Sequence, residues 1–163
     1  MKNLKSVIMN VAVVLLGVLA LVFMSQAYYT ISMAGQSESA TGFDFLESAK
    51  DAPSDYTLVQ VSVIIGIVVL SIMMLVAIVN LLANLGVIKS EKVAKILKFV
   101  NVAAAVLFVV FAVCALVGVA NLVADTNAFV KMASIGWACI ANLVVAVVTA
   151  VATVLDLVVK NKK

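Results

Sequence analysis

Polar side chains set inside long apolar segments are the residues of this chain most able to do chemistry. Asp156 is the one carboxylate well inside an apolar run, and such a charge is expected to pair, with Lys98, Lys5 or an asparagine as the partner. Counted from one end of each segment, a set of polar residues falls at similar depth: Asn10, Asn80, Asn84, Asn101 and Asp156. We interpret this set as an inner polar layer that fixes helix register, with the inner mouth of a pore as the alternative.

A second pattern occupies the last apolar segment. Small or polar residues recur there at every fourth position: Ser134, Ala138, Asn142, Ala146 and Ala150. Small side chains at this spacing let membrane helices approach closely, so the pattern predicts a packing stripe against another helix of the same chain or of another subunit. Asn142 is expected to form a hydrogen bond between helices, the alternative being that it lines a narrow aqueous path.

The residue types that are missing exclude several functions. The chain has no histidine and its eleven basic residues are all lysines, so it lacks the commonest general base and metal ligand and the guanidinium groups typical of nucleic-acid recognition. Cys114 and Cys139 lie in apolar segments and form no CxxC pair. The sequence shows no recognisable pair of a catalytic nucleophile and a general base. We expect no enzymatic activity, no cofactor, no metal and no nucleic-acid partner.

Four apolar segments must position these side chains, and hydrophobic residues make up 66% of the chain. The segments cover residues 7–27, 58–85, 96–124 and 132–159, each long enough to cross a bilayer once. They are too long for barrel strands, and helices satisfy the backbone within lipid. The sequence therefore predicts an all-α membrane protein, a single antiparallel four-helix transmembrane domain with an outer loop at 28–57.

The distribution of lysines predicts the orientation, because short lysine-rich loops stay in the cytoplasm. Nine lysines and two acidic residues fall at the ends of the segments and in the 86–95 loop on one side, and two lysines and six acidic residues fall on the other, for net charges of +7 and −4. Both termini are thus expected in the cytoplasm, with the chain in the plasma membrane. The start of the chain also resembles a signal peptide, but its apolar run is longer than usual, so we expect retention rather than cleavage.

The outer loop contains one predicted element of its own. Thr41 and Asp44 have the spacing of a capping box ahead of a short helix over 43–51, which Pro53 would end. This helix would rest on the bundle or the lipid surface, or Phe43, Phe45 and Leu46 would form a contact site for a partner or a neighbouring copy.

The loop layout resembles that of claudin-type tetraspan proteins and of large-pore channels such as connexins, with a longer first outer loop and short later loops. The tryptophan and paired cysteines that mark the first outer loop of claudins are absent between Tyr28 and Thr57, as are the loop cysteines of connexins. The resemblance is one of topology, and no residue role is transferred.

Two functions remain. The chain is expected to be a non-catalytic tetraspan protein that contacts the lipid bilayer and either forms a homo-oligomer or serves as a structural or accessory subunit beside other membrane subunits. The alternative is an oligomeric channel lined by asparagine, serine and threonine. Asparagines pointing into a dry bundle would favour the first function, and asparagines around a shared aqueous axis would favour the second.

Overall fold

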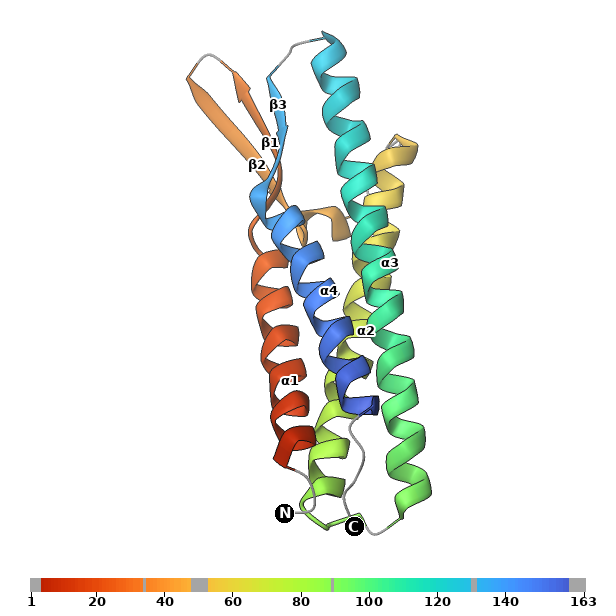
Figure 1. The fold of residues 1–163 in the computed structure, drawn as a ribbon. Coiled ribbons are helices and arrows are strands. Elements are labelled where there is room, and N and C mark those ends of the chain that lie inside the picture. Colours follow the sequence, from red (N-terminus) through yellow and green to blue (C-terminus); the bar gives the residue numbers. More distant parts are fainter. Residues whose placement is uncertain (1–3, 34, 48–52, 89, 130–131, 159–163) are drawn as a thin grey trace.

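Four long helices make up most of the molecule (Figure 1). The computed structural model describes residues 4–33, 35–47, 53–88, 90–129 and 132–158. The helices are α1 (Leu4–Met24), α2 (Ser54–Asn84), α3 (Glu91–Phe129) and α4 (Trp137–Val158). All four are long and apolar enough to cross a membrane, which indicates a multi-pass membrane protein. They overlap the four predicted apolar segments, with ends that differ by up to five residues.

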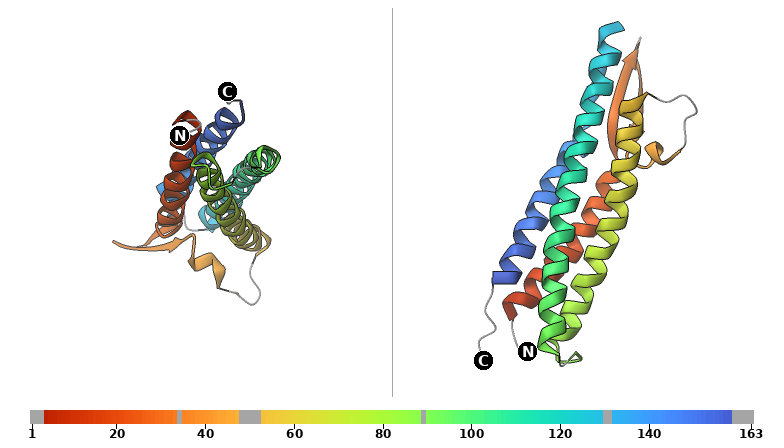
Figure 2. Two further views of the ribbon diagram at one scale, coloured as in Figure 1. Left: turned by 90° about the horizontal axis from the view of Figure 1, so that it is seen from below. Right: turned by 90° about the vertical axis from the view of Figure 1, so that its right-hand side faces the viewer.

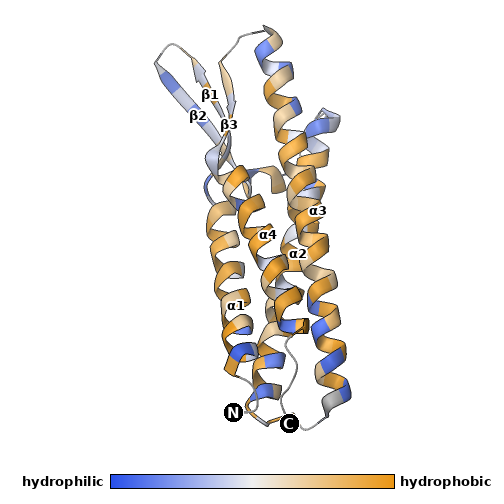
Figure 3. Ribbon diagram, in the orientation of Figure 1, coloured by the Kyte–Doolittle hydropathy of each residue, from blue (hydrophilic) through white to orange (hydrophobic). Residues whose placement is uncertain are grey.

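The helices form a ring in which α1 and α3 each pack against both α2 and α4 (Figure 2). The apolar residues form a band along the helices, and most polar residues lie toward the two ends (Figure 3). Gly118 brings α2 and α3 close together, since a Cβ at that position would lie 2.7 Å from the Val59 side chain and 3.1 Å from the Asp55 carbonyl oxygen.

A three-stranded sheet stands at the end of the bundle opposite the start of α1, which we call the outer end (Figure 1). The predicted all-α fold is therefore confirmed in its four long helices but lacked this sheet. Strands β1 (Ala27–Met33), β2 (Gln36–Thr41) and β3 (Ala133–Ile135) pair antiparallel in the order β2-β1-β3. The signal was present in the aromatic and β-branched residues of β1, followed by Gly35 at a φ of +84° between the paired Met33 and Gln36. Strand β3 is too short to recognise before its pairing with β1 is known.

The fourth helix begins later than predicted. The span was expected from residue 132, but the chain first forms β3 and enters α4 at Trp137, so Ser134 lies in a strand and not on the helix. Gly136 forms the junction, where its N–H donates to the Tyr28 carbonyl oxygen at 2.7 Å. A Cβ at Gly136 would overlap the backbone of Ala27, so only glycine fits between β1 and α4.

The predicted loop helix over 43–51 is reduced to a single 3-10 turn, η1 (Asp44–Leu46), with residues 48–52 lying outside the described part of the chain. The Thr41 and Asp44 caps do form, with the Asp44 N–H donating to Thr41 Oγ1 at 3.2 Å and the Thr41 N–H donating to the Asp44 carboxylate at 2.6 Å. Glu47 turns to an extended conformation, and its carbonyl oxygen accepts from Tyr56 and Gln60 of α2. These tertiary bonds use an acceptor that a continuing helix would have paired internally.

Candidate functional site

Asp156 is the centre of a buried polar cluster at the inner end of the bundle, the end at which α1 begins. Its carboxylate accepts hydrogen bonds from Ser6 Oγ, from Asn10 Nδ2 at 3.1 Å and from Lys98 Nζ at 3.1 Å. Lys98 also donates to the Asp156 carbonyl oxygen at 2.8 Å. The predicted partners Lys98 and Asn10 are thus present, Ser6 was not anticipated, and Lys5 is exposed and forms no part of the cluster.

The other members of the predicted inner polar layer divide into two groups. Asn84 donates to Ser6 Oγ at 3.0 Å, which brings α2 into the Asp156 cluster. Asn80 and Asn101 lie about one helical turn farther into the bundle, where they are 1% and 2% exposed. Among the described residues, neither the Nδ2 nor the Oδ1 of Asn80 has a hydrogen-bond partner, and the Oδ1 of Asn101 has none either. All five predicted residues therefore face the interior, but only three of them join one network.

The geometry of Asp156 indicates an anchor and not a free base. Its side chain is 4% exposed and that of Lys98 is 11% exposed, so each charge is removed from water and compensated by the other. The cluster connects α1, α2, α3 and α4 at one level.

The packing stripe predicted for the fourth helix is partly buried within the chain. Ala138 and Ala146 are fully buried and Asn142 is 4% exposed, whereas Ala150 is only half-buried. Two further buried residues of the same face were missed, Thr149 and Thr153, because a threonine hydroxyl can bond its own helix backbone, as both do here. The buried part of the stripe faces helices of the same chain.

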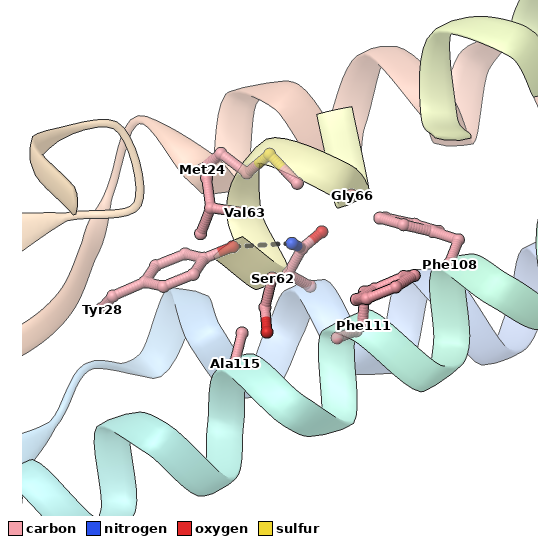
Figure 4. A pocket seen from close by; sticks show the side chains of 10 residues that line it. Met24, Tyr28, Ser62, Val63, Gly66, Phe108, Phe111 and Ala115 are labelled. Atoms are coloured by element: carbon pink, nitrogen blue, oxygen red, sulfur yellow. Dashed lines mark hydrogen bonds between the residues drawn. The ribbon is translucent and has the colours of Figure 1, made fainter. Parts of the chain in front are cut away.

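A second polar site lies below the sheet, where β1 enters the bundle (Figure 4). Tyr28 is 1% exposed, and the Asn142 side-chain amide donates to its hydroxyl oxygen at 2.6 Å. Burial raises the pKa of Tyr28 above its ordinary value, and the neighbouring Cys139 adds to the increase, so the phenol stays neutral. Both side chains line a small cavity with Ser62 and a set of apolar residues: Met24, Val63, Gly66, Phe108, Phe111, Ala112 and Ala115.

No family model, curated protein or solved structure gives a significant match to this chain. Within the described residues, no three histidine, cysteine or acidic side chains come together in a way that could hold a metal ion. The arrangement offers buried anchoring contacts and an exposed outer sheet.

The outer sheet is attached to the helices by polar side chains from α3. The Tyr29 hydroxyl and Thr126 Oγ1 lie 2.7 Å apart, and Asn127 bonds both the N–H and the carbonyl oxygen of Ala133 in β3. These contacts hold the sheet beside the end of α3 that projects beyond the bundle (Figure 1). The two asparagine bonds also explain how a three-residue strand is kept in place.

The predicted outer-loop contact site is largely turned inward. Phe45 is 2% exposed and its ring centroid lies 5.0 Å from that of Tyr56, so it belongs to the core. Phe43 is half-buried against that core, and Leu46 is exposed. Burying the Phe45 ring beside α2 removes apolar surface from water within the same chain, which stabilises the fold without a partner protein. The outer surface that stays exposed includes strand β2 of the sheet, which the sequence analysis did not predict.

Proposed function

We propose that this chain is a non-catalytic tetraspan protein of the plasma membrane that acts as a structural or accessory subunit, binding another membrane protein or a further copy of itself through the outer sheet. Its termini face the cytoplasm in this proposal, with the lysine-rich inner end on the same side and the sheet outside.

The observation that carries the proposal is the edge of the sheet. Strand β2 pairs only with β1 in the described chain, and Gln36, Ser37, Glu38 and Ser39 are exposed along it. An open edge presents unpaired N–H and carbonyl groups that can pair with a strand of another protein. Because Gly136, Asn127 and Thr126 fix the sheet to the bundle, the edge is presented in one orientation.

The direction of the buried polar groups supports an interaction role over a channel formed by several copies. Asn10, Asn80, Asn101 and Asn142 are all buried inside one chain. The residues exposed around the helices are instead large and apolar, as in Leu15, Leu75, Val110 and Val144. A pore shared between copies requires polar groups on those outer faces.

Charge favours a basic partner for the outer end. The described acidic residues there are Glu38, Asp44, Glu47, Asp55 and Asp125, and the predicted outer side as a whole carries a net charge of −4. Two such surfaces facing each other would repel, whereas a basic surface would be attracted. A second copy at the edge of the sheet would bring two exposed Glu38 carboxylates into the same interface, so charge favours a different, basic partner there over a second copy.

Photo-crosslinking from a single introduced residue tests the proposal. A photoreactive amino acid replacing Ser37 in β2 should crosslink a second protein in native membranes, and mass spectrometry of the adduct separates a copy of the chain from a different subunit. The same amino acid replacing Val18, exposed on the lipid side of α1, is the matched control and should not give that adduct. Absence of a Ser37 adduct together with ion flux through purified protein in liposomes would overturn the interaction role in favour of a channel.

A further inference from the structure

The cavity beneath β1 brings together three polar groups from three different elements. Tyr28 comes from β1, Ser62 from α2 and Asn142 from α4, and the three residues are 1%, 3% and 4% exposed (Figure 4). The rest of the lining is apolar. Polar groups this deeply buried are normally hydrogen-bonded, because an unpaired group has lost its hydrogen bonds to water without replacement.

The hydrogen bond between Asn142 and Tyr28 leaves other donors and acceptors of the three residues without partners in the described part of the chain. Asn142 donates to the Tyr28 oxygen, which leaves the Tyr28 hydroxyl proton free to donate in turn. The Oδ1 of Asn142 has no partner among the described residues. The Ser62 hydroxyl can both donate and accept. The group therefore offers at least one donor and two acceptors toward a shared space.

The volume of the cavity and the lack of charged residues in its lining indicate which ligand fits it. The volume open to the centre of a water-sized sphere is about 10 Å³, close to the minimum for one water molecule. No charged side chain lines the cavity, so a cation would lack compensation. A water molecule matches both requirements, since it accepts one hydrogen bond and donates two, close to the usual number for a buried water.

We propose that Tyr28, Ser62 and Asn142 form a binding site for one structural water molecule. The water accepts from the Tyr28 hydroxyl and donates to Asn142 Oδ1 and Ser62 Oγ. It thereby extends the direct contact between β1 and α4 to α2, so that the base of the outer sheet is bonded to two helices of the bundle.

A crystal structure of the full chain grown in a lipidic mesophase tests the site directly. The expected result is an electron-density peak within hydrogen-bond distance of at least two of the three groups. A map that resolves waters at the ends of the bundle but has no peak in this cavity would overturn the proposal.

A stability measurement separates a hydrated cavity from a dry one. Ser62→Val places methyl groups in the space, and Ser71→Val makes the same change at an exposed position of the same helix. If water occupies the site, Ser62→Val displaces it and leaves the Tyr28 hydroxyl proton and Asn142 Oδ1 without partners, although Asn142 still donates to the Tyr28 oxygen. Its melting temperature in detergent should therefore fall roughly 2–8 °C below that of Ser71→Val. A dry cavity would instead be filled, and an equal or higher melting temperature for Ser62→Val would contradict the proposal.

Discussion

At the scale of single residues, the bundle is notable for how it pairs its buried charges. Asp156 and Lys98 meet at 3.1 Å with little access to water, and Ser6 and Asn10 take up further acceptor sites on the carboxylate. A buried ion pair adds little net stability by itself, but removing one partner leaves a charge that neither water nor protein compensates. Replacing either residue alone should therefore reduce the stability of the fold much more than replacing both together.

Asp156→Asn tests this coupling. The amide is nearly isosteric but leaves the Lys98 ammonium without its counter-charge, so the free energy of unfolding should fall by about 3 kcal/mol. Adding Lys98→Met should recover at least half of that loss, measured by denaturant or thermal unfolding in detergent.

Lys92→Met is the control, because Lys92 is an exposed lysine of α3, the helix that also carries Lys98. This change should not restore the stability of Asp156→Asn. Wild-type stability of Asp156→Asn alone would show that the ion pair is not an anchor.

At the scale of elements, two buried positions require a small residue, one where the sheet meets the bundle and one inside the bundle. Gly136 lies against the backbone of Ala27 where β3 passes into α4, and the fully buried Ala146 lies where α4 packs inside the bundle. Backbone atoms cannot move aside as a flexible side chain can, so an atom added at Gly136 must displace β1 or α4.

Gly136→Ala should be strongly destabilising. Its Cβ would overlap Ala27, so the hydrogen bond between Gly136 and Tyr28 cannot form without moving β1 away from α4. We expect a loss of at least about 3 kcal/mol and faster proteolysis of the β1–β2 hairpin from the outside. Ser134→Ala, an exposed change in the adjacent strand, should alter stability by less than about 0.5 kcal/mol. If the two variants resist protease equally, the close contact at Gly136 does not hold β1 against α4.

Ala146→Leu tests the packing of α4. Inserting a larger side chain at a fully buried position should cost about 1–3 kcal/mol by overpacking. Val147→Leu enlarges the next residue, which is exposed on the lipid side, and should have little effect on thermal unfolding in detergent. If the two variants have the same melting temperature, Ala146 does not pack against another helix.

At the scale of the whole molecule, charge and shape define two different ends. The inner end holds the connection between α2 and α3 and the buried Asp156 cluster, while the outer end holds the sheet and the exposed acidic residues (Figure 1). The lysine distribution predicts that the inner end faces the cytoplasm.

Cysteine labelling in intact cells tests this orientation. In a background with Cys114 and Cys139 changed to alanine, Ser37→Cys should react with an impermeant maleimide, and Ser90→Cys should react only after the membrane is permeabilised. Both serines are exposed in the structure, so differences in burial would not explain the result. Labelling of Ser90→Cys from outside would reverse the orientation.

The number of spans and the lysine asymmetry could be predicted from the sequence, because each depends on the length or composition of a continuous segment. The inward direction of the asparagines was also a reasonable expectation, since polar groups avoid lipid. Strand β3, the Ser6 hydrogen bond to Asp156 and the contact of Tyr28 with Asn142 were decided by the tertiary structure. Ser6 and Asp156 are 150 positions apart, and Tyr28 and Asn142 are 114 apart. Such pairs depend on the rotation of each helix and the path of each loop, and neither is encoded in the local pattern of either partner.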